Sequence, residues 1–128
     1  MKELQNDIRT YLKERNWDQL RPGDVVKSIS IEAAELLEHF QWENPELESF
    51  KKDSQQIEEV RNELADVFIY CLDLAVLLDI DAEEAIREKL EKVKKKYPAE
   101  MFQNISRDPG TEDIYKKIKQ AHRNQGTV

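Results

Sequence analysis

Apolar residues along this chain recur every three or four positions, which is the spacing of one face of an α-helix. No segment alternates apolar and polar residues between turn signals, as a half-buried strand would. The sequence therefore predicts an all-α fold that resembles a four-helix bundle. The four helices are expected at about residues 2–14, 24–42, 54–78 and 82–97, with a linker or an extra turn within 47–56.

Residues that cap or break helices separate these segments. Asp24 follows a Pro-Gly pair and is expected to be the N-cap of the second helix, while Asp81 has the position of a capping-box residue before the fourth. Pro98 is expected to end the fourth helix. Beyond it, RDPGT at 107–111 predicts a turn, and residues 112–122 predict a short amphipathic helix.

The length of 128 residues fits a single core, so we expect one all-α domain at residues 1–100 and a C-terminal extension at 101–128. The chain carries 27 acidic and 20 basic residues, and this negative balance argues against a nucleic-acid polymer as partner. A single cysteine, Cys71, allows no intramolecular disulfide. No stretch reaches the roughly 18 apolar residues of a membrane span. We therefore expect a soluble, cytoplasmic protein without a membrane partner.

Two of the predicted helices carry carboxylates in apolar surroundings. Helical spacing aligns Glu32 with Glu35 on the second helix, and Glu63 with Asp66 on the third. From residue 64 to 78, Asp66 and Asp73 are the only charged residues. Neither acidic stripe includes a Lys or Arg. If the stripes face each other, four carboxylates share a dry, low-dielectric crevice, where a divalent cation would compensate their repulsion.

Ligands that are all oxygen favour Mg²⁺, or Mn²⁺, over Zn²⁺, and Mg²⁺ commonly shares its coordination shell with substrate phosphates. Phosphate chemistry is therefore the leading class. A di-iron carboxylate centre would need Glu-x-x-His pairs, but His39 lies four residues after Glu35. The alternative interpretation is that the acidic spacings are surface positions paired with lysines, which is common in a chain this rich in charge.

Three segments, IEAAELLEHFQW, EVRNELADVFIY and DIDAEEAIREKLEKVKKKYP, resemble in this order the MazG-like all-α nucleoside triphosphate pyrophosphohydrolases, and most nearly their dCTP pyrophosphatase branch. The resemblance covers about residues 15–98. It implies Mg²⁺-dependent hydrolysis of a (deoxy)nucleoside triphosphate to a monophosphate and pyrophosphate, and a role in clearing the nucleotide pool. It also implies a homodimer or homotetramer, which fits a third helix that is apolar on several faces.

The resemblance further implies roles for individual residues. The expected metal ligands, one of which would also orient the attacking water, are Glu32, Glu35, Glu63 and Asp66. The expected stacking residues for the base are Trp17, Trp42 and Tyr70, although each ring also suits core packing. Lys89 and Lys96 match basic positions of the family, and Lys27 lies one turn before Glu32. These three are candidate phosphate ligands, or else solvated lysines.

Two positions depart from the family pattern. Val93 stands where relatives commonly carry Asn, and Ile8 stands where dCTP-selective relatives carry His, so a preference for cytosine does not transfer. The rival function is a non-catalytic helical oligomer that binds nucleotide or protein and keeps a vestigial metal site. Turnover of nucleotides separates the two functions.

Overall fold

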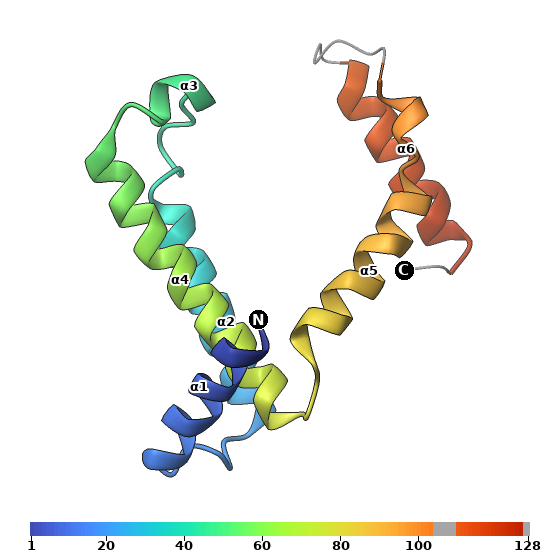
Figure 1. The fold of residues 1–128 in the computed structure, drawn as a ribbon. Helices are drawn as coiled ribbons and strands as arrows, with labels where there is room; N and C mark the ends of the chain where they lie inside the picture. The colour runs from blue at the N-terminus through green and yellow to red at the C-terminus, as the bar shows by residue number, and fades with distance from the viewer. Residues whose placement is uncertain (104–109, 127–128) are drawn as a thin grey trace. The chain divides into compact units, whose positions relative to one another are not determined.

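The computed structural model describes residues 1–103 and 110–126, and within these residues it contains helices and no strand. The all-α class is therefore confirmed. The elements are α1 (Lys2–Glu14), α2 (Pro22–Glu38), α3 (Leu47–Phe50), α4 (Ser54–Leu77), α5 (Ala82–Lys96), the 3₁₀ turn η1 (Ala99–Met101) and α6 (Gly110–Asn124) (Figure 1). Across this part of the chain, no helix is both long enough and apolar enough to cross a bilayer.

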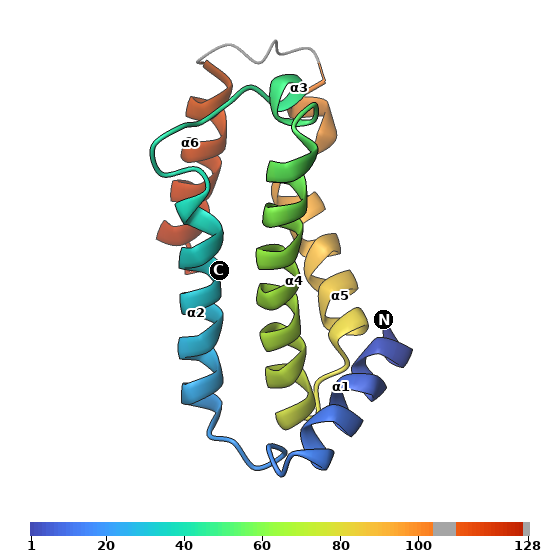
Figure 2. The same cartoon turned by 90° about the vertical axis from the view of Figure 1, so that its left-hand side faces the viewer.

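The chain divides into two compact units, Met1–Glu83 and Glu84–Val128. In the first unit α2 and α4 lie side by side and run in opposite directions, and α1 packs against α4 (Figure 2). The division into a domain at 1–100 and an extension at 101–128 stays a prediction. The buried apolar core of the first unit comprises Ile8, Leu12, Leu72, Ala75, Val76 and Ala82.

Gln5 fastens α1 to the connection between α4 and α5. Its Nε2 donates a hydrogen bond to the Ile80 carbonyl at 2.6 Å, and its Oε1 accepts one from the Ala82 N–H at 3.1 Å. Both polar groups of this buried amide are therefore satisfied, as a polar side chain in a core requires. The contact fixes the N-terminal part of α1 against the connection that follows α4.

The ends of α2 differ from the sequence prediction. The helix begins at Pro22 with Arg21 as its N-cap, so Asp24 lies in the first turn and is not the N-cap. Proline suits the first helical position because its fixed φ is helical and its missing N–H has no partner there. The helix ends at Glu38, about four residues earlier than expected, where the Phe40 N–H bonds to the Leu37 carbonyl at 2.9 Å and tightens the last turn.

The other helices follow the sequence closely. The extra turn expected within 47–56 is α3, and α4 opens after Asp53, whose side chain accepts a hydrogen bond from the Gln56 N–H at 3.0 Å. In the second unit, the Tyr97 and Tyr115 rings stack with centroids 5.2 Å apart and join the end of α5 to α6. The helix expected at 112–122 is α6, and most of the turn expected at 107–111 lies outside the described residues.

Candidate metal centre and adjoining pocket

Carboxylates from α2 and α4 meet where these two helices pack. Glu32, Glu63 and Asp66 each offer one oxygen, and the three oxygens lie within 4.8 Å of one another. Oxygens on opposite sides of a magnesium ion are about 4.2 Å apart, since each lies about 2.1 Å from the metal. We call these three residues the acidic trio, and its oxygens are spaced so that it can hold a divalent cation.

Glu35 adjoins the trio without being part of it. Burial raises the pKa of Glu32, and the negative charges of Glu35, Asp66 and Glu63 raise it further. A hydrogen bond between the carboxyl groups of Glu32 and Glu35 also favours a proton on Glu32. The negative charges that favour a proton on Glu32 would also favour a divalent cation bound beside it.

The trio is open to solvent on one side. The Glu63 side chain is 27% exposed, Glu32 is half-buried, and Asp66 and Glu35 are exposed. The prediction of a dry crevice is therefore wrong for the single chain. Helical spacing correctly shows that the two stripes can face each other, but two helices alone do not cover a stripe of carboxylates.

His39 extends the acidic stripe towards the end of α2. Its Nδ1 lies 3.8 Å from Glu59 Oε2, and its Nε2 lies 4.0 Å from Glu63 Oε1. The sequence excluded a di-iron role for His39 and gave it no other. A signal was present, because His39 is spaced four residues from Glu35, as neighbours on one helical face are. The imidazole therefore lies beside the Glu63 carboxylate, at more than hydrogen-bond distance.

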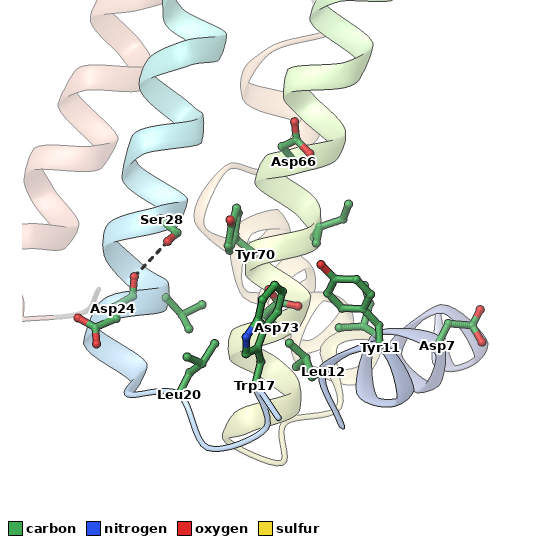
Figure 3. A pocket seen from close by; sticks show the side chains of 13 residues that line it. Asp7, Tyr11, Leu12, Trp17, Leu20, Asp24, Ser28, Asp66, Tyr70 and Asp73 are labelled. Atoms are coloured by element: carbon green, nitrogen blue, oxygen red, sulfur yellow. Dashed lines mark hydrogen bonds between the residues drawn. The ribbon is translucent and has the colours of Figure 1, made fainter. Parts of the chain in front are cut away.

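A cavity of about 590 Å³ adjoins the trio, a volume within the range of small-molecule sites. Asp66 belongs to both the trio and the wall of this cavity. Figure 3 shows the aromatic side chains of Tyr11, Trp17 and Tyr70 around the hollow, with Asp66 further along α4. We call this hollow the aromatic pocket. Its walls come from α1, α2, α4 and the connection after α1.

The aromatic pocket offers flat surfaces and two phenols, those of Tyr11 and Tyr70. Trp17 meets Tyr11 edge to face, with ring centroids 5.9 Å apart, and its side chain remains 44% exposed. Burial raises the pKa of Tyr70, and the charges of Glu32 and Asp73 raise it further. The Tyr70 hydroxyl therefore keeps its proton at neutral pH and can donate a hydrogen bond. A planar heterocycle suits such a pocket.

The pocket also contains a buried carboxyl group, Asp73, for which the sequence predicted no role. Asp73 is 5% exposed, and its Oδ1 has no hydrogen-bond partner among the described residues. Burial raises the pKa of this carboxyl group above its ordinary value. In the sequence, Asp73 stands out as one of two charged residues in a long apolar stretch. The cavity beside it forms only where α1 packs against α4, and the sequence did not show that packing.

Trp42 and Lys27 do not line the aromatic pocket, and their roles, like those of two lysines on α5, stay predictions. Trp42 is 87% exposed and lines a separate hollow of about 330 Å³ together with His39. The Lys27 Nζ lies 3.4 Å from Asp24 Oδ1, and its side chain is 78% exposed. Lys89 and Lys96 are on α5, in the second unit. The structure therefore brings Trp17 and Tyr70, but not Trp42, to the aromatic pocket.

Comparisons with known proteins give one consistent result. Residues 27–111 match the model of the MazG-like family. The chain is 29% identical over 101 residues to dCTP pyrophosphatase 1 of Homo sapiens, a match that covers 76% of this chain and 58% of that protein. It is 35% identical over 88 residues to the dATP/dGTP diphosphohydrolase of Cyanophage S-2L, covering 69% and 68%. The chain thus spans little more than half the length of the mammalian relatives that it matches.

A solved structure is also similar. The crystal structure of a pyrophosphatase from Archaeoglobus fulgidus DSM 4304 superposes with a TM-score of 0.66 at 41% sequence identity. The match covers 77% of this chain and 92% of that one. The helical fold described above is therefore shared with a protein that has been solved experimentally.

Proposed function

The chain belongs to the MazG-like family, as the sequence segments predicted, and from this premise we propose that it is a nucleoside triphosphate pyrophosphohydrolase. The reaction would cleave a (deoxy)nucleoside triphosphate between the α and β phosphates, releasing a monophosphate and pyrophosphate. The names of its relatives, a dCTP pyrophosphatase and a dATP/dGTP diphosphohydrolase, support this class of substrate. One observation of the structure carries the proposal, namely that the acidic trio adjoins a pocket of suitable size for a base.

The acidic trio would hold the cation, with Glu35 beside it as the fourth carboxylate. The ligands are all oxygen, which fits Mg²⁺, or Mn²⁺, better than a softer metal. When bound, such an ion supplies positive charge that neutralises phosphate oxygens and lowers the pKa of water. A carboxylate of Glu32, Glu35, Glu63 or Asp66 would accept a hydrogen bond from the attacking water and orient it in line with the bond that breaks.

The aromatic pocket would hold the base. Trp17 and Tyr70 line it, and aromatic stacking on a nucleobase typically contributes about 1–3 kcal/mol. Asp66 lies in the wall of the pocket and in the acidic trio, so a base in the pocket would leave the phosphates beside the carboxylates. Trp42, Lys27, Lys89 and Lys96 remain further candidates for substrate contacts.

A homodimer or homotetramer is part of the proposal. Helices α2 and α4 leave large apolar side chains exposed, including Ile31 at 56%, Leu37 at 61% and Phe68 at 58%. Large apolar side chains with this much exposure fit a contact with another chain better than a face left in water. Sedimentation equilibrium would give the number of chains, and a monomer at micromolar concentration would contradict this part. A cytoplasmic role in removing surplus or modified nucleotides is proposed with it.

Nucleotide turnover is the direct test of the function. The protein is incubated with the four common dNTPs, dUTP and the four NTPs, with Mg²⁺ and separately with excess chelator, and the products are resolved by ion-exchange chromatography. We expect a monophosphate and pyrophosphate in equal amounts, only when Mg²⁺ is present. Intact triphosphates across the whole panel would contradict the enzyme and leave the non-catalytic binding module as the remaining function. A nucleoside diphosphate and orthophosphate would mean a different reaction.

A further inference from the structure

Asp73 is a carboxyl group in the wall of the aromatic pocket, one turn of α4 beyond Tyr70. It is 5% exposed, so it has lost almost all of its contact with water. No atom in the part of the chain that the structure describes hydrogen-bonds to its Oδ1. The pocket lining includes Leu12, Val25 and Ile69, whose side chains offer no donor, and also Tyr11, Trp17 and Tyr70, whose donors make no hydrogen bond to Oδ1.

A buried acceptor without a partner destabilises a fold, and native proteins retain few of them. Leu72, Ala75 and Val76, its near neighbours along α4, belong to the buried apolar core, and an apolar residue in place of Asp73 would be less costly there. The carboxyl group therefore has no structural benefit in the single chain. An acceptor retained at such a cost beside a cavity is typical of a site whose partner is a ligand.

We propose that Asp73 selects the base of the nucleotide, because its carboxyl group, in the wall of the aromatic pocket, accepts a hydrogen bond from an exocyclic amino group. The preferred substrates would then be triphosphates of cytosine, adenine or guanine, and the disfavoured ones those of uracil and thymine. This inference rests on the proposed function, since it assigns the base to the aromatic pocket. It adds a residue that determines specificity, whereas Trp17 and Tyr70 stack on any base.

Cytosine and uracil are the sharpest pair for this inference because they share size and shape. Cytosine presents the N4 amino group as a donor where uracil presents the O4 carbonyl oxygen as an acceptor. A uracil in the pocket would face the Asp73 carboxyl group with another acceptor, and its N3–H is flanked by two carbonyl oxygens that repel a carboxyl group. A site built to hydrogen-bond one group rejects the analogue that lacks it.

The test compares dCTP with dUTP, using the full chain and Mg²⁺. We expect kcat/KM to be about 10- to 100-fold higher for dCTP than for dUTP. This range corresponds to the free energy of one buried acceptor that is paired with dCTP and left unpaired with dUTP. In Asp73→Asn, the amide offers an acceptor and a donor of nearly the same shape. We expect this variant to bring the dCTP/dUTP ratio close to one, mainly through faster turnover of dUTP.

Asp79→Asn is the matched control. It makes the same chemical change just past the end of α4, at an exposed residue that pairs with Arg9 and lies outside the aromatic pocket. Asp79 has a φ of 53°, a conformation that asparagine adopts readily, so the control should fold normally. We expect it to keep the dCTP/dUTP ratio of the unmodified protein.

Equilibrium binding of the product monophosphates gives a second readout that needs no turnover. We expect dCMP to bind at least about tenfold more tightly than dUMP, a difference lost in Asp73→Asn. Equal kcat/KM for dCTP and dUTP in a protein that hydrolyses nucleotides would overturn this inference alone. A ratio that Asp73→Asn leaves unchanged would do the same. Hydrolysis of no nucleotide would overturn the proposed function, and equal binding of dCMP and dUMP would then overturn the base selection too.

Discussion

Two acidic regions of α4 lie seven residues apart and differ in kind. Near Asp66, carboxylates from two helices gather in a site that is open to water on one side. At Asp73, a single carboxyl group is buried with no partner in the described chain for its Oδ1. The comparison teaches that the number of charges and their access to water together indicate the ligand. Several charges that repel one another favour a cation, whereas one buried acceptor favours a neutral hydrogen-bond donor.

The two regions also divide the proposed substrate between them. The acidic trio would act on the phosphates, which every nucleotide has in common, and Asp73 on the base, which differs between nucleotides. Changes in the trio should therefore affect the turnover of all nucleotides alike. Changes at Asp73 should affect the choice between nucleotides.

The largest effect is expected from Glu63→Gln, which removes a charge from the acidic trio. Loss of a metal ligand should remove several kcal/mol of transition-state stabilisation, a decrease of about 10³-fold or more in kcat for every nucleotide. Steady-state kinetics on dCTP and dATP measures this. Glu58→Gln is the control, since Glu58 is on the same helix but pairs with Arg61 at 2.9 Å and lies outside the trio. Unchanged turnover in Glu63→Gln would remove this residue from the site.

Addition of Mg²⁺ should have the next largest effect, this time on stability. A cation held by the trio at about 100 times its Kd stabilises the folded protein by about 2.7 kcal/mol, which raises Tm by several degrees. Differential scanning calorimetry with and without Mg²⁺ measures the shift, and Glu63→Gln should lose most of it. A Tm that is the same with Mg²⁺ and with chelator would mean that the trio binds no ion.

Trp17→Ala should have a smaller effect, of about 10- to 100-fold on kcat/KM, because it removes one stacking surface from the aromatic pocket. The loss should appear chiefly as a higher KM, and should be similar for every base. Trp17→Phe keeps a flat ring beside Tyr11 and should restore most of the activity. A larger loss in Trp42→Ala than in Trp17→Ala would instead place the base at the separate hollow near His39.

The smallest effect is expected in the pH dependence of stability at Asp73. Burial raises the pKa of this group above its ordinary value of 3.8, so above that pH the folded protein keeps a proton that the unfolded chain loses. Stability therefore falls as pH rises through this window and stays lower above it. Relative to the unmodified protein, Asp73→Asn should gain on the order of 1 kcal/mol at neutral pH and little at about pH 3.5.

Urea unfolding at the two pH values measures this difference, with Asp79→Asn as the control for a change of charge. Asp79 is exposed, so its variant should differ from the unmodified protein by a similar small amount at both pH values. A gain for Asp73→Asn that is equal at low and neutral pH would mean that the carboxyl group is not desolvated in solution.

Much of the fold and part of the site could be predicted from the sequence. Periodicity alone places α1 and α4 closely, because their apolar stripes are long and regular. The approach of Glu32 to Glu63 and Asp66 also follows from the spacing. Residues three apart lie on one face of a helix, so the acidic faces of α2 and α4 can meet where these helices pack. Helix ends were harder, as the start of α2 shows, where Pro22 replaced Asp24 as the starting signal.

Features that depend on how helices cover one another were not predictable. The exposure of the acidic trio depends on what packs over α2 and α4, which no spacing along one helix reveals. The aromatic pocket needs α1 to lie against α4, so that Tyr11 and Trp17 reach Tyr70. The isolation of Asp73 depends on the same packing. In the sequence it was visible as an unusual charge in an apolar run, without any sign of the cavity beside it.

The identity of the products tests the central claim most directly. The protein is incubated with dCTP and Mg²⁺ in water enriched in ¹⁸O, and the products are followed by ³¹P nuclear magnetic resonance. We expect dCMP and pyrophosphate in equal amounts, with one ¹⁸O atom in either of them, and no signal from dCDP or orthophosphate. Release of orthophosphate, or dCTP and the other dNTPs left intact by a folded protein saturated with Mg²⁺, would contradict a pyrophosphohydrolase site formed by Glu32, Glu63 and Asp66.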